Sequence, residues 1–259
     1  MGRLVWVLAI ACGQVLAAVD TTHGAWDKWL KVHVTASGPV STVDYRAAKA
    51  KPEALNAYVK WAEAVPKTEF DALKEGDRLA FLINAYNALT VKLVVENYPV
   101  KSIKDIGGLF SSPWKKKFFT LFGEEHSLDD IEHEMIRKWF AEPRIHFAVV
   151  CASKGCPALR DEAFVGAKVD AQLEAAARGF LKDVSRNRYD AKDGKIYLSK
   201  IFDWYGGDFV KKYGSVQSFV VPRMATPAEP EAKLKTAELG FGDYDWTLNE
   251  TPPRATSGS

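Results

Sequence analysis

Two cysteines separated by four residues are the side chains in this sequence best suited to covalent chemistry. Cys151 follows a run of apolar residues and Cys156 precedes a proline, with the turn Ser153-Lys-Gly155 between them. A thiol between a strand and a helix N-terminus has its thiolate stabilised by exposed backbone amides, which also form an oxyanion hole. The same spacing permits a disulfide in an oxidising compartment. Cys151 is therefore either a nucleophile or half of a Cys151–Cys156 disulfide.

A carboxylate and an imidazole adjoin each other on a helix expected over residues 128–140. The apolar face of this helix includes Glu132, and His133 projects from the edge of the same face. Because a buried carboxylate is costly without a partner, Glu132 either pairs with an arginine, such as Arg144 or Arg160, or lines a functional site.

A second imidazole, His146, is the competing base. It lies five residues before Cys151 in an expected strand and projects from the opposite face if that strand is regular. Its alternative role is that of a hydrogen-bonded core histidine. A nucleophile, a base and an orienting group are the parts of a cysteine hydrolase. We expect Cys151 as the nucleophile, His133 as the general base and Glu132 as the group that orients it.

Two asparagines interrupt the most apolar helix of the chain. Asn84 and Asn87 are three residues apart on one side of this helix. Buried amides require hydrogen-bond partners. The pair either contacts a substrate or a catalytic histidine, or ties the helix to a neighbouring loop.

Motifs for nucleotides, metals and nucleic acids are missing from the sequence. It contains no P-loop, no dinucleotide-binding glycine fingerprint, no H-E-x-x-H and no G-x-S-x-G. The spacing C-x4-C is not a usual zinc pattern, so we expect neither a metal nor a cofactor. The short run Lys115-Lys-Lys117 is typical of a solvated loop. The expected partner is a small-molecule or peptide substrate, with no nucleic acid.

Hydrophobic periodicity predicts more helices than strands. Helical segments are expected over residues 43–65, from an Asp77 N-cap to Asn97, over 127–140 behind a Ser127–Asp130 capping box, from Cys156-Pro157 onward, over 169–184 and over 202–213. Strands are expected over residues 145–150 and in a 188–198 hairpin that turns at Asp193-Gly194. The expected fold class is α+β, a mainly helical single domain with a small sheet that includes both.

Length, charge and the two ends of the chain predict one exported domain. The 259 residues carry 35 Lys and Arg against 33 Asp and Glu, too balanced for an electrostatic nucleic-acid or membrane surface. Residues 1–18 have the pattern of a secretory signal peptide, residues 19–250 form the expected domain, and residues 251–259 an expected disordered tail. We expect a periplasmic or secreted protein without an integral membrane segment after cleavage. A lipoprotein anchored at Cys12 is the less favoured alternative.

Several segments together resemble a known family. They are Phe81-Leu-Ile-Asn84-Ala-Tyr-Asn87-Ala-Leu, Leu128-Asp-Asp-Ile-Glu132-His133, Pro143-Arg-Ile-His146-Phe-Ala-Val-Val-Cys151-Ala-Ser-Lys-Gly-Cys156-Pro157, Phe202-Asp-Trp-Tyr-Gly-Gly-Asp-Phe209 and Tyr244-Asp-Trp-Thr-Leu-Asn249. In this order they resemble the domain of unknown function 547 family. The resemblance implies a bacterial, exported protein whose motif positions are Asn84, Glu132, His133, His146 and Cys151.

The resemblance implies no activity, so the functional hypotheses rest on residue types. The first is a cysteine hydrolase or acyltransferase that acts on amide or thioester bonds. The second is a non-catalytic periplasmic binding module in which Cys151–Cys156 is a structural disulfide.

Overall fold

Helices dominate this chain, of which the computed structural model describes residues 19–107 and 111–252. The α-helices are α1 (Gly24–His33), α2 (Tyr45–Ala50), α3 (Glu53–Glu63), α4 (Lys67–Ala72), α5 (Glu75–Asn97), α6 (Arg137–Trp139), α7 (Val169–Leu181), α8 (Ile201–Trp204), α9 (Gly206–Tyr213), α10 (Val216–Met224) and α11 (Glu231–Leu234). The 3-10 helices are η1 (Ile103–Ile106), η2 (Pro113–Lys115), η4 (Pro143–Phe147) and η5 (Gly166–Lys168), and η3 (Asp130–Ile136) is a π-helix. The strands are β1 (Val34–Ser37), β2 (Val40–Val43), β3 (Phe119–Leu121), β4 (Glu124–His126), β5 (Arg188–Asp190), β6 (Lys195–Leu198) and β7 (Glu238–Phe241).

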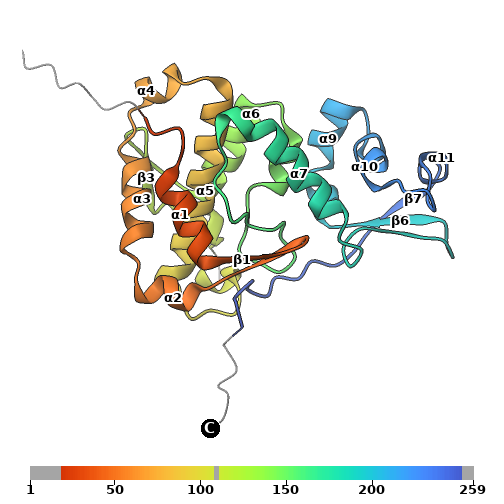
Figure 1. The fold of residues 1–259 in the computed structure, drawn as a ribbon, viewed down its shortest axis with the longest axis horizontal. Helices are drawn as coiled ribbons and strands as arrows, with labels where there is room; N and C mark the ends of the chain where they lie inside the picture. Colours follow the sequence, from red (N-terminus) through yellow and green to blue (C-terminus); the bar gives the residue numbers. More distant parts are fainter. Residues whose placement is uncertain (1–18, 108–110, 253–259) are drawn as a thin grey trace, which may run out of the picture.

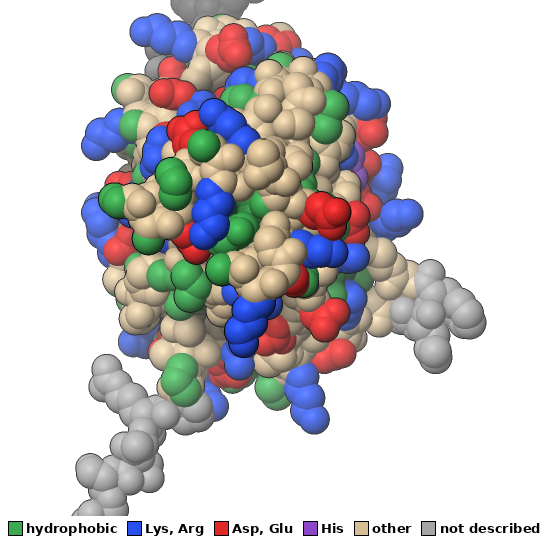
Figure 2. Space-filling view, turned by 90° about the vertical axis from the view of Figure 1, so that its right-hand side faces the viewer, with side chains coloured by type: hydrophobic (Ala, Val, Ile, Leu, Met, Phe, Trp, Pro, Cys, Tyr) green, Lys and Arg blue, Asp and Glu red, His purple; other side chains and the backbone are tan. Residues whose placement is uncertain are grey.

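The arrangement is a single-domain, mainly helical α+β fold, which confirms the expected fold class. Helices α1 to α5 gather at one end, and α9, α10, α11, β6 and β7 lie at the other (Figure 1). On the face at that second end, Lys and Arg side chains are interspersed with Asp and Glu (Figure 2). This mixture agrees with the small net charge of +2.

Helix α5 is the central element because its sequence is apolar on nearly every side. Its residues from Leu79 to Val91 are all buried, including both asparagines. A helix that is hydrophobic all round belongs in a core or in a membrane. By length and composition α5 is able to cross a bilayer, but 89% of its most apolar window is buried inside the protein, as in a core helix.

Two hydrophobic clusters meet at η4. The larger cluster surrounds α1 to α5, and the smaller one joins α7 to α10. Ile145 of η4 packs into the larger cluster, whereas Phe147, two residues later, packs into the smaller one. The segment that carries His146 is therefore held from both sides.

The small sheet forms where the hairpin is predicted. Strands β5 and β6 pair in antiparallel register around Gly194, whose φ of +71° suits the turn. Strand β7, which the sequence does not predict, adds to β6 in parallel.

The prediction of a strand over residues 145–150 is wrong. Residues 143–147 form the 3-10 helix η4, and residues 148–150 are an irregular segment. The Asn87 side chain donates to Ala148 O at 2.9 Å and accepts from Val150 N at 3.0 Å. One amide side chain thus supplies the partners that a neighbouring strand provides in a sheet, and an apolar run alone does not distinguish the two arrangements.

The helix expected from Cys156-Pro157 onward is also absent, because residues 157–165 are irregular in the structure. The Arg186 guanidinium donates to the carbonyls of Gly155 and Cys156. These carbonyls therefore have a side-chain partner in place of helical N–H groups. The thiolate stabilisation expected from a helix N-terminus at this position does not apply.

Smaller differences concern helix boundaries. The helical segment expected over 43–65 is divided into α2 and α3 at Pro52, and α5 begins at Glu75, so Asp77 lies in its first turn. The Ser127–Asp130 capping box is confirmed by reciprocal hydrogen bonds of 2.8 and 3.2 Å.

The predictions for both chain ends fall largely outside the described residues. The signal peptide over 1–18, with Cys12, lies outside them, as do residues 253–259 of the tail. Thr251, at the start of the expected tail, is ordered, because its N–H donates to Val43 O at 2.9 Å.

Candidate functional site

A cavity of about 230 Å³ lies among segments from six parts of the chain. Its walls are mostly aromatic, with a few titratable side chains. The lining residues are Tyr86, Ser112, Trp114, Asp129, Glu132, His133, His146, Val149, Cys151, Cys156, Pro157, Ile201, Trp204, Tyr205, Tyr244 and Trp246. We call this space the aromatic cavity. It brings together Cys151, Glu132, His133 and His146, the four side chains for which the sequence predicts catalytic roles.

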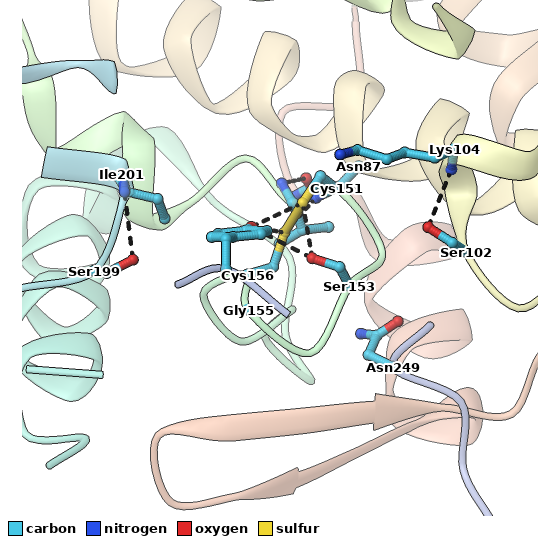
Figure 3. The surroundings of a disulfide bond; sticks show 12 residues. Asn87, Ser102, Lys104, Cys151, Ser153, Gly155, Cys156, Ser199, Ile201 and Asn249 are labelled. Carbon is cyan, nitrogen blue, oxygen red and sulfur yellow. Dashed lines mark hydrogen bonds between the residues drawn. A yellow bond between two sulfur atoms is a disulfide. The ribbon is translucent and has the colours of Figure 1, made fainter. Parts of the chain in front are cut away.

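The two cysteines are joined in a disulfide that borders the aromatic cavity. Figure 3 shows this bond within the 151–156 loop, next to Asn87. The Cα atoms of Cys151 and Cys156 are 6.1 Å apart, within the usual range for a disulfide. In this oxidised form Cys151 has no free thiol.

A tyrosine phenol contacts both sulfur atoms. Tyr244 Oη lies 3.1 Å from Cys151 Sγ and 3.2 Å from Cys156 Sγ. Burial raises the pKa of Tyr244 to about 12, so the phenol remains protonated at neutral pH. Because disulfide sulfurs carry no hydrogen, the Tyr244 hydroxyl is the donor in this contact.

Glu132 is a buried carboxylate held by phenols. Its side chain comes from η3, where the Arg137 N–H donates to Glu132 O across the five-residue spacing of a π-helix. Tyr86 Oη donates to Glu132 Oε2 at 3.1 Å, and burial and the same carboxylate raise the pKa of the neighbouring Tyr205. Only 6% of Glu132 is exposed.

The ion pair considered for Glu132 is not present. Arg144 pairs with Glu142, and Arg160 pairs with Glu162. Each arginine has a carboxylate close to it in sequence, which satisfies its charge away from the aromatic cavity. Glu132 is therefore buried with hydrogen-bond donors but without either arginine.

His133 is partly exposed and is oriented by a group other than Glu132. Its Nδ1 lies 3.1 Å from Arg137 Nη1 but 4.0 Å from Glu132 Oε1, beyond hydrogen-bond distance. Its Nε2 lies 3.9 Å from Asp129 Oδ1. The expected Glu132–His133 orienting hydrogen bond is thus not formed.

His146 has the surroundings of a positioned base. It is only 2% exposed, its ring stacks on Tyr205 at 3.9 Å, and its Nε2 lies 2.8 Å from Asp208 Oδ2. Since the Asp208 carboxylate only accepts, the proton is on Nε2 and Nδ1 carries the lone pair. That Nδ1 has no hydrogen-bond partner among the described residues. Burial lowers the pKa of His146, so the ring is neutral at pH 7.

Asp208 is held in turn by an arginine. Arg137 Nε and Nη2 donate to its two oxygens at 2.7 and 2.9 Å, a bidentate pair. The hydrogen bond from His146 and the Arg137 guanidinium together hold the pKa of Asp208 well below its usual range. Asp208 is therefore a fixed anion that orients His146.

Sequence reasoning missed Asp208 and the aromatic walls. Asp208 lies in the Phe202–Phe209 segment that carries part of the family resemblance, and it is one of two acidic residues in that segment. An acidic side chain among aromatic residues indicates that its carboxylate has a charged or hydrogen-bonding partner in the folded protein. Nothing comparable in the sequence marks Trp114 or Trp246 as members of the same cavity.

The two asparagines lie outside the cavity lining, and their amides bind backbone. Asn84 Nδ2 donates to Phe164 O at 2.7 Å, and Asn84 Oδ1 accepts from Phe164 N at 3.0 Å. Asn87 binds the 148–150 segment in the same reciprocal manner. In this arrangement Asn87 positions the residue that precedes Cys151.

The chemistry available in the aromatic cavity is acid–base and sulfur chemistry. Three or more His, Cys, Asp or Glu side chains do not cluster in metal-binding geometry anywhere in residues 19–107 and 111–252. The cavity offers a sulfur pair at Cys151 and Cys156, a neutral imidazole with an anionic partner, and a buried carboxylate.

Comparison with known proteins gives one match. Residues 70–181 match the family model described as "Protein of unknown function, DUF547". This segment contains Glu132, His133, His146 and Cys151, whereas Asp208 and Tyr244 lie beyond it. No curated protein and no solved structure matches the chain.

Proposed function

We propose from the aromatic cavity that the protein, whose residues 70–181 match the DUF547 family model, is a cysteine-dependent hydrolase or acyltransferase. Its substrates are amides or thioesters, and it acts when the Cys151–Cys156 disulfide is reduced. We propose Cys151 as the nucleophile, His146 as the general base and Asp208 as the group that positions His146.

The observation that carries this proposal is the state of His146. A buried imidazole normally has partners at both nitrogens, but in the part of the chain that the structure describes His146 is paired at Nε2 and has no partner at Nδ1. Cys151 and His146 line the same cavity. An imidazole oriented by a carboxylate and a cysteine sulfur that line one cavity have the composition of a nucleophile–base–orienter triad.

Reduction by a dithiol opens the disulfide and yields two thiols and an oxidised dithiol. The Cys151 thiol then transfers its proton to His146 Nδ1, and its sulfur attacks the substrate carbonyl carbon. The resulting imidazolium, stabilised by Asp208, gives the proton to the leaving amine or thiol as the C–N or C–S bond breaks. Water, deprotonated by His146, hydrolyses the acyl-Cys151 thioester to the acid and restores the thiol. In an acyltransferase another nucleophile replaces water.

The test uses the dithiol-reduced protein and p-nitrophenyl acetate, with acyl-Cys151 measured by intact mass and peptide mapping. We expect Cys151→Ser to remove the acyl-enzyme and His146→Gln to slow acylation by about 10²- to 10⁴-fold. His133→Gln is the matched control, because this histidine borders the same cavity without a carboxylate hydrogen bond, and it should change the rate by less than about tenfold. Equal acylation of wild type and Cys151→Ser would rule the proposal out.

The disulfide itself favours a second candidate, a non-catalytic periplasmic binding module. There Cys151–Cys156 is a structural bond, and export to an oxidising compartment keeps it closed. Quantitative thiol labelling of the chain isolated from its native compartment, without reductant, separates the two candidates. A free, labelled Cys151 supports the hydrolase, and a fully crosslinked 151–156 peptide supports the binding module.

A further inference from the structure

We propose that the aromatic cavity selects ligands that carry a protonated amine, which binds to the carboxylate of Glu132. As a substrate class this inference rests on the proposed hydrolase; as a binding property it is measurable on its own. In this proposal the protonated amine is the group that the cavity recognises, and the amide or thioester is the bond that is cleaved.

The charge balance of the cavity lining is the first observation. The lining contains two carboxylates, Glu132 and Asp129, and neither lysine nor arginine among the described residues. His146 is neutral because burial lowers its pKa. A cationic ligand is therefore favoured over an anionic one.

One cation that packs against the lining is already paired. Arg137 lies against the Tyr205 ring, with Cζ 5.3 Å from the centroid, and binds Asp208 through both oxygens. Asp208 therefore offsets much of its charge, and its Nη1 lies 3.1 Å from His133 Nδ1. Burial raises the pKa of Asp129, the other carboxylate of the lining, and the nearby His133 and Lys115 partly oppose this rise.

Glu132 is the buried end of the site. Its side chain is more than nine-tenths buried; Tyr86, which donates to it, and the neighbouring Tyr205 are both neutral because burial raises their pKa. A buried carboxylate whose partners are neutral donors lacks the cation that normally offsets its desolvation. A ligand ammonium at this position provides the missing charge.

The opposite wall consists of aromatic rings that contact one another. Trp204 lies 4.9 Å from Tyr244 and Tyr244 lies 4.6 Å from Trp246, centroid to centroid, while Trp114 packs edge-on to Trp246 at 5.6 Å. Lys104 Nζ lies 3.7 Å from the Trp246 centroid, so this wall already attracts one cation from the protein itself. Such rings bind both a cation and the apolar body attached to it.

The test compares two ligands of the same shape, phenethylamine and phenethyl alcohol. Binding is measured by tryptophan fluorescence quenching and calorimetry on the oxidised protein and on a Cys151→Ser/Cys156→Ser variant. We expect the amine to bind at least about tenfold more tightly than the alcohol, with the preference reduced by salt. Glu132→Gln should abolish the preference, and Asp129→Asn should reduce it.

Glu134→Gln is the matched control, because Glu134 lies on the same η3 helix but is exposed and pairs with Lys138. It should leave the preference unchanged. Equal affinity for the amine and the alcohol in the wild type, or a preference that survives in folded Glu132→Gln, overturns the inference. An amine preference without any acyl-Cys151 supports this inference and overturns the hydrolase; an acyl-enzyme without an amine preference does the reverse.

Discussion

Buried polar side chains occur in two regions of this protein, along α5 and around the aromatic cavity, and they differ in how their hydrogen bonds are satisfied. On α5, the amides of Asn84 and Asn87 each donate to and accept from backbone of a single distant segment. Around the cavity, His146 has one nitrogen without a partner within residues 19–107 and 111–252, and Glu132 accepts from the neutral phenol of Tyr86 and lies 4.0 Å from His133.

The difference separates architectural polar groups from those available to a ligand. A fully paired amide in a core specifies how two segments meet, and its loss leaves backbone groups unpaired. A buried group with unused hydrogen-bonding capacity costs stability in the free protein and is able to interact with an incoming molecule. The polar side chains are buried in both regions, so their pairing distinguishes them and their burial does not.

The largest effect expected on the architectural side is that of Asn87→Ala. It leaves Ala148 O and Val150 N without their partner in the core, and we expect the free energy of unfolding to fall by roughly 3 kcal/mol. Urea denaturation measures this. Asn97→Ala is the matched control, since Asn97 bonds only to Leu93 O of its own helix, and its cost should stay below about 1 kcal/mol. Equal costs at the two positions would mean that the pairing of Asn87 does not stabilise the core.

Two buried imidazoles, those of His23 and His146, should make the stability of the protein depend on pH. Burial lowers the pKa of His23 to about 4 and also lowers that of His146. In each case the unfolded chain takes up protons first as the pH falls below about 6.5, so stability is complete above about pH 7 and is lost toward pH 4. His23 alone should cost about 2 kcal/mol between pH 7 and about 4.5. Urea midpoints across this range measure the loss.

His23→Gln tests the assignment of that pH dependence. His23 Nδ1 is paired with Tyr58 Oη at 2.9 Å, as expected for an architectural histidine. The variant should flatten the pH profile between about pH 6.5 and 4, with the residual slope coming from His146, the half-buried His33 and carboxylates whose pKa the fold lowers, such as Glu142. An unchanged slope would show that His23 is not the principal proton acceptor on unfolding.

Opening the disulfide should have an effect of similar size. The 151–156 loop is short, so the chain-entropy gain from crosslinking it is about 2 kcal/mol. We expect Cys151→Ser/Cys156→Ser to lower the free energy of unfolding by this amount or less and to leave the fold intact by circular dichroism. A collapse of the fold would show that the disulfide is required to hold the site, which favours the binding module.

The smallest change is expected for Glu132→Gln. The variant removes a buried charge while it keeps an oxygen that accepts from Tyr86, so its stability should remain within about 1 kcal/mol of the wild type. The same urea measurement tests this. A loss as large as that of Asn87→Ala would place Glu132 among the architectural groups.

Much of the fold follows from local patterns. The α5 helix, the α7 helix, the hairpin turning at Gly194 and the Ser127–Asp130 capping box depend on periodicity and turn chemistry within about twenty residues, and all are present. The 145–150 strand failed because its apolar run is equally compatible with an irregular buried segment. The partner that decides between them is Asn87, 63 residues from Val150.

The candidate site, like the fold, is predicted by the sequence only as far as local patterns reach. Residue types and the order of motifs identified Cys151, Glu132, His133 and His146, and the structure places all four around one cavity. The orienting carboxylate is Asp208 for His146, at a separation of 62 residues, and not Glu132 for His133. Adjacency on one helix predicted the wrong pair, because the side chains of consecutive helical residues do not face each other.

The sequence by itself determined the chemical groups that this protein has available, the mainly helical α+β class and the resemblance to a family. Each depends on local composition and short-range periodicity, which are readable in one dimension. The tertiary structure decided which buried groups are paired, that Cys151 faces Tyr244 and Cys156, and that aromatic residues from η2, α8 and the C-terminal segment form one wall. Hydrogen-bond partners and cavity walls come from segments far apart along the chain, so only their packing in three dimensions specifies them.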